Sequence, residues 1–280
     1  MVSPDRTVTE AEAAGVAARI AAAFALDPAV IAIAWAGSWT TGFAAARSDI
    51  DLYVYAENEM SLPLRTDIAR RFAGPESEIE LDNRFWEPGD EWRDAASGIW
   101  IDVMYRTPDW VEDQLARVLD RHEASTGYST SFWHNVRTSR SLFDCEGWFA
   151  SLQSSAARPY PEELRTAIIA KNQPILGAIH SSYRSQIVAA MARDDMVAVN
   201  HGVSAFLASA FDVIFALNRV PHPGEKRMVE QAEARCPLRP ALLRDQVLAI
   251  LEPVESTIIS GLDALVADLD RLLYAEGVSI

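Results

Sequence analysis

Asp49 and Asp51, two aspartates separated by one residue, are the residues of this sequence whose type and spacing most clearly suggest a chemical role. They begin the run Asp49-Ile50-Asp51-Leu52-Tyr53-Val54-Tyr55, whose apolar and β-branched residues predict a strand. Side chains alternate along a strand, so both carboxylates project to one side, roughly 6–7 Å apart along the chain. Like charges so placed repel unless a cation joins them, and Mg2+ binds one or two carboxylates together with phosphates and water. The pair therefore predicts a divalent metal site.

Two further features favour this interpretation over a solvated polar strand. Gly37-Ser38 ends an earlier apolar run, residues 29–35, which predicts a buried strand. Because Gly37 has no Cβ, the backbone there can approach a bound group closely. A third carboxylate, Asp102, lies within the apolar run 98–105, where a charge without a partner would be unfavourable.

This combination resembles the pattern of the polymerase-β-type nucleotidyltransferases: Gly37-Ser38, ten intervening residues, Asp49-Ile50-Asp51, then Asp102 on a later strand. Length and arrangement are most similar to small-molecule nucleotidyltransferases, the aminoglycoside and lincosamide modifiers and their uncharacterised bacterial relatives. The resemblance covers residues 28–106 and, more loosely, the C-terminal half. It implies an antibiotic-modification-like chemistry in which a substrate hydroxyl attacks the α-phosphorus of a nucleotide and pyrophosphate leaves.

The resemblance also implies roles for individual residues. Asp49, Asp51 and Asp102 would be catalytic and would hold two Mg2+ ions, which can stabilise both the attacking and the leaving oxygen. Gly37 and Ser38 would bind the phosphates of ATP or another nucleoside triphosphate. Asp102 is the first choice for general base, with Glu87 and Glu91 as alternatives.

Three other residues are candidates for contact with a substrate. The segment 218–227 resembles a loop that presents a basic residue to the nucleotide, which would make Lys226 nucleotide-binding; a solvated loop lysine is an equal alternative. Trp39 and Trp92 are the tryptophans that we consider for stacking on a base or substrate, although packing is the commoner role of such residues.

Composition narrows the class of acceptor. The net charge of −15 disfavours nucleic acid, whose binding depends on Lys and Arg, and favours a small hydroxylated molecule that could be cationic. Two cysteines, Cys145 and Cys236, make no disulfide framework, and the N-terminus is unlike a secretory signal, so a cytoplasmic protein is expected. The most apolar segment, 203–217, is short for a membrane span. The oligomeric state is open, and a homodimer is one alternative.

The element pattern predicts an α+β protein with two domains. Residues 1–150 alternate helices and short strands, as in a mixed α/β catalytic domain, with an edge strand at 78–81 and a turn at 87–91. Residues 151–161 read as a linker, and residues 160–280 predict an all-α bundle that includes one long or broken helical stretch over 162–193. Two other functions stay open: transfer to a protein or tRNA end, and an inactive relative that serves as a binding module.

Overall fold

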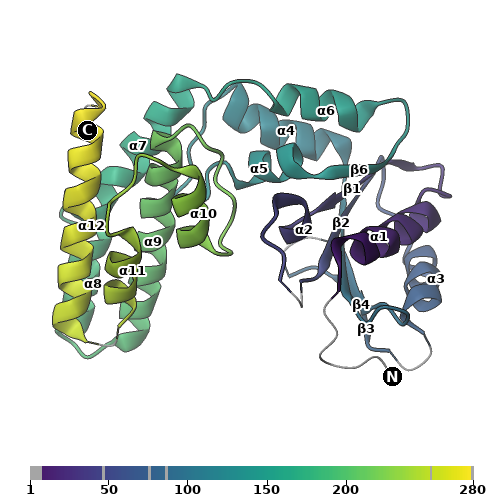
Figure 1. Cartoon of the computed structure of the whole chain (residues 1–280), viewed down its shortest axis with the longest axis horizontal. Coiled ribbons are helices and arrows are strands. Elements are labelled where there is room, and N and C mark those ends of the chain that lie inside the picture. The colour runs from purple at the N-terminus through teal and green to yellow at the C-terminus, as the bar shows by residue number, and fades with distance from the viewer. Residues whose placement is uncertain (1–7, 46–47, 75–76, 86–87, 253, 279–280) are drawn as a thin grey trace. The chain divides into compact units, whose positions relative to one another are not determined.

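The computed structural model describes residues 8–45, 48–74, 77–85, 88–252 and 254–278, which form two compact units (Figure 1). The first unit contains residues 1–115 and 135–158, and the second contains residues 116–134 and 159–280. The chain therefore passes between the units three times. The predicted division into 1–150 and 160–280 differs from this arrangement because residues 116–134 pack with the C-terminal helices.

The first unit is built on a mixed sheet, six-stranded among the described residues, in the order β3-β4-β5-β2-β1-β6. The strands are β1 (Val30–Ala36), β2 (Ile50–Ala56), β3 (Ile79–Asn83), β4 (Gly89–Arg93), β5 (Trp100–Arg106) and β6 (Arg140–Asp144). The helices are α1 (Glu10–Phe24), α2 (Ser38–Thr41), α3 (Leu62–Ala73), α4 (Pro108–Leu119), α5 (Ser131–Thr138) and α6 (Trp148–Ala156), of which α4 and α5 contribute residues to both units. The predicted α+β class is confirmed.

The two faces of the sheet have different surroundings. One face carries the fully buried residues Ile50, Leu52, Ile101 and Val103, which form one hydrophobic core with residues of α1 and α3. Figure 1 shows these two helices side by side beside the sheet. Because side chains alternate, the aspartates of β2 and β5 project from the opposite face.

Several local predictions are confirmed and others are wrong. Thr9 and Glu12 form a capping box at the start of α1. The strand predicted at 78–81 is β3, at the sheet edge. The predicted turn at 87–91 is wrong, because residues 89–93 pair with β5 as β4. The predicted linker is also partly helical, since α6 extends to residue 156 with its apolar side buried.

A buried ion pair joins α3 to β4. Arg65 is 1% exposed and Asp90 is fully buried, with Nε–Oδ2 and Nη2–Oδ1 distances of 2.8 and 2.5 Å. Asp90 also accepts hydrogen bonds from the Tyr105 hydroxyl at 2.7 Å and the Asp82 backbone N–H at 2.9 Å. Burial by itself lowers the pKa of Arg65, but the hydrogen bonds and charge of Asp90 outweigh burial and raise it. The pair is thus fully hydrogen-bonded, the condition under which a buried carboxylate is tolerated.

The second unit is a helical bundle, as predicted. Its helices after α6 are α7 (Glu162–Gly177), α8 (Tyr183–Met191), α9 (Met196–Leu217), α10 (Met228–Arg235), α11 (Leu243–Leu251) and α12 (Glu255–Ala275). The stretch predicted over 162–193 is broken between α7 and α8. Among the described helices, α9 is long and apolar enough to cross a membrane, but 67% of its apolar window is buried inside the structure. It contacts α7 and α8, as a central core helix does.

A buried carboxylate of α9 fastens the 125–130 segment to the bundle. Asp212 is 1% exposed and accepts hydrogen bonds from Ser129 Oγ at 2.6 Å, Ser129 N at 3.1 Å and Asn172 Nδ2 at 3.3 Å. Asn172 Oδ1 also accepts the Gly127 N–H at 2.9 Å. A Cβ on Gly127 would lie 2.8 Å from Cβ of Ala208, so glycine permits this close approach to α9.

A first prediction concerns the ion pair of the first unit. Arg65→Met leaves the Asp90 carboxylate buried without its cation and should lower the free energy of unfolding by about 3–5 kcal/mol. Urea unfolding followed by tryptophan fluorescence measures this unit, because seven of the eight tryptophans belong to it. Arg19→Met is the control: its Nη2 lies 3.9 Å from Asp94 and its side chain is 53% exposed, so its loss should be below about 1 kcal/mol. Equal losses in both variants would contradict the prediction.

A second prediction concerns pH and Asp212. Burial raises the pKa of this carboxyl to about 7, although its hydrogen bonds from Ser129 oppose the shift. A raised pKa means that the folded state binds the proton more tightly, so the stabilisation is complete below pH 3.8 and is lost as pH rises to about 7. Relative to Asp212→Asn, the wild type should therefore lose up to about 4 kcal/mol of unfolding free energy across this interval.

The difference between the two proteins is the informative quantity, because His222 acts in the opposite direction. Burial, with the nearby charge of His134, lowers the pKa of His222 to about 3, so its stabilisation is lost as pH falls. This contribution is common to wild type and Asp212→Asn and cancels in the comparison. Unfolding monitored by far-ultraviolet circular dichroism at several pH values gives both curves. Parallel curves would show that Asp212 keeps an ordinary pKa.

Candidate active site

Strand pairing brings the predicted acids of β2 and β5 side by side. Asp51 pairs with Asp102 across the parallel β2–β5 ladder, and Asp102 pairs with Glu91 of β4 on its other side. The row continues to Glu80 on β3 and, in the other direction, to Ala36 at the end of β1. Directly paired residues share a face with Cβ atoms about 4.5–5.5 Å apart. Four carboxylates therefore form an acidic row across one face of the sheet.

The remaining predicted aspartate lies beside this row. Asp49 stands one residue before β2, so alternation along the chain directs it to the same face as Asp51. Within the part of the chain that the structure describes, no three His, Cys, Asp or Glu side chains are grouped as a metal site. The structure thus brings Asp51 and Asp102 into register without a closed protein cage around a cation.

Gly37 is the point at which β1 meets the acidic row. Its φ of 77° and ψ of −154° lie in a region that only glycine adopts readily. A Cβ at this position would lie 1.8 Å from Oδ2 of Asp51, so the carboxylate of Asp51 packs directly against the Gly37 backbone. The predicted Gly-Ser turn and the predicted Asp pair are therefore in contact.

Ser38 follows immediately and begins the short helix α2. Its hydroxyl oxygen is buried and, in the described structure, has no hydrogen-bond partner. It is one of several buried polar atoms without a partner among the described residues, and it is available for a hydrogen bond with a ligand. The neighbouring Thr40 hydroxyl, by contrast, donates to the Gly37 carbonyl at 3.0 Å and stabilises the turn.

One end of this face is covered and the other is open. Towards the carboxyl end of β2, Tyr53 is 9% exposed and Tyr55 is fully buried. The ring centroid of Tyr55 lies 5.2 Å from that of Trp148 and 5.5 Å from that of Phe149. Arg106 stacks over the Tyr53 ring at 4.5 Å and over the Trp110 ring at 4.8 Å. The acidic row lies at the opposite end of the same strands, where the described residues Asp51, Asp102 and Glu91 are partly exposed.

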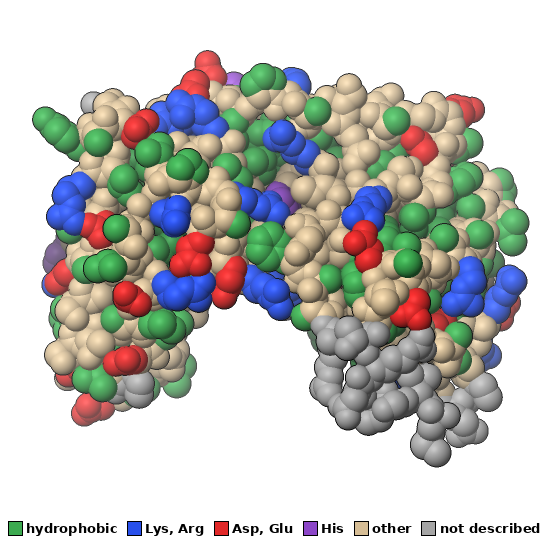
Figure 2. All heavy atoms as spheres, in the orientation of Figure 1, with side chains coloured by type: hydrophobic (Ala, Val, Ile, Leu, Met, Phe, Trp, Pro, Cys, Tyr) green, Lys and Arg blue, Asp and Glu red, His purple; other side chains and the backbone are tan. Residues whose placement is uncertain are grey.

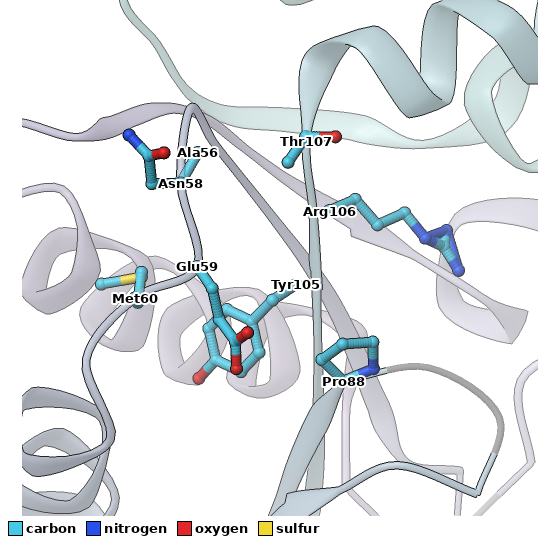
Figure 3. Close-up of a pocket in the computed structure, with 8 residues that line it drawn as sticks. All are labelled: Ala56, Asn58, Glu59, Met60, Pro88, Tyr105, Arg106 and Thr107. Atoms are coloured by element: carbon cyan, nitrogen blue, oxygen red, sulfur yellow. The ribbon is translucent and has the colours of Figure 1, made fainter.

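A separate pocket of about 160 Å³ lies beyond the carboxyl ends of β2 and β5 (Figure 3). Its lining includes Glu59, Met60, Tyr105 and Thr107, and the Arg106 side chain points away from the Tyr105 ring. None of the predicted site residues lines it. Figure 2 shows acidic and basic side chains interspersed over the face drawn there, so net charge alone does not locate a site.

Some sequence predictions for this site require correction. Trp39 is 7% exposed and Trp92 is fully buried in the core, so neither is available for stacking on a ligand. Glu91, predicted within a turn, lies on β4 beside Asp102, whereas Glu87 lies outside the described residues. Lys226 belongs to the second unit, between α9 and α10, and its role at a nucleotide stays a prediction.

The chain is similar to a protein family and to a solved structure. A family model described as a domain of unknown function (DUF4037) matches residues 131–228, from α5 through α9, and leaves out the strands with the acidic row. Among solved structures, the chain is similar to the crystal structure of a nucleotidyltransferase-like protein from Exiguobacterium sibiricum 255-15. The sequence identity is 14%, the TM-score is 0.43, and the match covers 93% of this chain and 74% of that one. No curated protein sequence matches the chain.

A third prediction tests the contact between Gly37 and Asp51. Gly37→Ala adds both backbone strain and a clash with the carboxylate, whereas Gly42→Ala adds strain alone, because φ there is +79° and no atom lies within 4 Å of a new Cβ. Gly42→Ala should cost about 1–2 kcal/mol of unfolding free energy, and Gly37→Ala clearly more. Adding Asp51→Ala should reduce the cost of Gly37→Ala, since it removes the clashing oxygen. If the losses of unfolding free energy from Gly37→Ala and Asp51→Ala were additive in the double variant, the contact would be contradicted.

Proposed function

We propose that this chain is a metal-dependent nucleotidyltransferase, which moves a nucleoside monophosphate onto a hydroxyl of a small molecule and releases pyrophosphate. AMP from ATP is the group that we expect to be transferred. The observation that carries the proposal is the contact of Gly37 with Asp51 and the pairing of Asp51 with Asp102. It combines a glycine turn and two carboxylates on neighbouring strands at the open end of a sheet.

The residues present fit a divalent cation with nucleotide phosphates. Mg2+ is usually bound by one or two carboxylates, with phosphates and water completing its shell. Asp49 and Asp51 would hold the ion on the triphosphate, and Asp102 would complete a second metal site. When bound, Mg2+ would neutralise charge on the phosphates and stabilise the developing charge of the leaving group.

The protein's own groups would supply orientation and proton transfer. The Ser38 hydroxyl, buried and without a partner, would donate to a phosphate oxygen next to the Gly37 backbone. The acceptor oxygen would attack the α-phosphorus, the bond to the bridging oxygen would break, and pyrophosphate would leave. Asp102 would accept the proton of the acceptor hydroxyl, and Glu91, on the adjacent strand, is the alternative base.

The acidic row also favours a cationic acceptor. If Asp51 and Asp102 hold the metal, Glu91 and Glu80 continue the row on the side away from Gly37. A cleft lined by one sign of charge raises the local concentration of the opposite sign. The net charge of −15 is consistent with such a substrate and unfavourable for nucleic acid.

A fourth prediction tests the nucleotide and metal site. ATP with Mg2+ should raise the melting temperature, because a ligand that binds only the folded state stabilises it by mass action. ATP with excess chelator should give little or no shift. An equal shift under both conditions would contradict a metal bridge between the acids and the phosphates.

The same proposal is tested by activity, with pyrophosphate release as the readout across nucleotides and acceptors. Asp51→Asn keeps the shape of the side chain but removes its charge, so transfer should fall by about 10²-fold or more in a folded protein. Asp67→Asn, at an exposed carboxylate of α3 outside the acidic row, is the matched control and should retain activity near that of wild type. Wild-type turnover in Asp51→Asn would remove Asp51 from the catalytic set. Nucleotide binding without any transfer would favour a binding module, and transfer only to protein or tRNA would replace the proposed acceptor.

A further inference from the structure

Trp100 is an exposed tryptophan on the same face of the sheet as the acidic row. It is the first residue of β5, two positions before Asp102, so both side chains project from one face. Its side chain is 45% exposed, whereas the core-facing Ile101 between them is fully buried. In the described part of the chain, the indole of Trp100 takes part in no hydrogen bond, ring pair or cation–π contact.

The other described tryptophans have structural contacts that account for them. Trp35, Trp92 and Trp133 are buried in the interiors of their units. Trp148 donates its indole N–H to Glu112 at 2.7 Å and packs on Tyr55. A single exposed aromatic residue is common on protein surfaces, so exposure alone carries no conclusion. The position of Trp100 among charged residues is the distinguishing feature.

The strand register places carboxylates around this indole. In the parallel β2–β5 ladder Ile50 pairs with Ile101, and Asp49 and Trp100 each stand one residue before that pair. On the other side Trp100 pairs with Arg93, and Glu91 lies two residues along the same strand. Asp49, Asp102 and Glu91 therefore flank Trp100, and among the described residues Arg93 lies with them, its Nε donating to the Gly98 carbonyl at 2.8 Å. An aromatic face among carboxylates is the arrangement that binds an ammonium group, by cation–π and ionic attraction together.

The sheet order assigns Trp100 to one side of the proposed reaction. Gly37 and Ser38 follow β1, which neighbours β2, whereas Trp100 lies on β5 at the far side of β2. Adjacent strands are about 4.7–4.9 Å apart, so the phosphate side and Trp100 are separated by roughly 10 Å. With the phosphates at Gly37 and Ser38, Trp100 lies on the side from which the acceptor hydroxyl approaches Asp102.

From this placement we infer that Trp100 is the residue on which the acceptor stacks, and that the acceptor is a small hydroxylated amine whose ammonium group lies against the indole. The inference rests on the proposed function and adds a binding residue to it. The indole holds the acceptor in position, and the neighbouring carboxylates favour an acceptor that carries a positive charge. The nucleotide does not contact Trp100.

The test measures amine binding without nucleotide, so that it does not depend on turnover. Isothermal titration would use a panel of amino sugars and hydroxylated polyamines, each paired with its N-acetylated, uncharged form. At least one amine should bind the wild type, and its acetylated form should bind at least about tenfold more weakly. Trp100→Ala should weaken binding of that amine about tenfold, and Trp100→Phe, which keeps an aromatic ring, only about twofold.

Two controls separate this inference from the proposed function. Trp110→Ala removes a tryptophan of similar exposure, 39%, from the covered end of the same face, and should leave amine binding within about twofold of wild type. The thermal shift given by ATP with Mg2+ should be the same in Trp100→Ala as in the wild type. Under turnover, Trp100→Ala should raise the acceptor KM and leave the nucleotide KM unchanged.

Four outcomes would overturn the inference: no amine of the panel binds the wild type, Trp100→Ala binds the amine as well as wild type does, the acetylated form binds equally well, or Trp100→Ala loses the ATP shift. The first three leave the proposed function standing wherever ATP with Mg2+ still stabilises the protein. Conversely, amine binding that depends on Trp100 in a protein with no ATP shift would support the cation site and contradict the nucleotidyltransferase proposal.

Discussion

The Arg65–Asp90 ion pair is the contact on which the geometry of the candidate site depends. It anchors β4 to α3 through a carboxylate that also binds Tyr105 of β5 and the backbone of β3. Because neighbouring side chains on a strand point to opposite faces, fixing Asp90 towards α3 fixes Glu91 towards the open face, opposite Asp102. A one-residue slip of β4 would reverse both, burying Glu91 and exposing Asp90. A stabilising contact on the closed face of the sheet thus sets the order of charges on the open face.

The open end of the other face has features that a stable interior would not select. It concentrates carboxylates in register, a glycine at a conformation that other residues avoid, and a buried hydroxyl without a partner. Each feature is unfavourable for folding by itself, since like charges repel and an unsatisfied buried hydroxyl loses its hydrogen bonds with water. We propose that these three features coincide at one strand end because the site binds a ligand.

The sequence of this protein predicts the structural elements that depend on residues close together in the chain. The strand that contains Asp51 and the edge strand predicted at 78–81 follow from periodicity and spacing within a few residues. The sequence does not predict the elements that depend on pairing between distant segments. The Pro-Gly signal at 88–89 predicted a turn, and only pairing with β5 makes Glu91 a strand residue beside Asp102. Likewise, no local pattern assigns residues 116–134 to the bundle, because hydrogen bonds to Asn172 and Asp212 hold them there.

The three passages of the chain between the two units have a consequence for biosynthesis. Residues 116–134 leave the ribosome before their partners Asn172, Asp212 and the His222 backbone, whose N–H bonds the Thr130 hydroxyl at 2.7 Å. At translation rates of about 5–20 residues per second, the interval between Ser129 and Asp212 is on the order of ten seconds. Until Asp212 is synthesised, Ser129 lacks the carboxylate that accepts its hydrogen bonds. Completion of the bundle therefore waits for the C-terminal half. A gene fragment ending near residue 160 would encode residues 116–134 without the helices against which they pack.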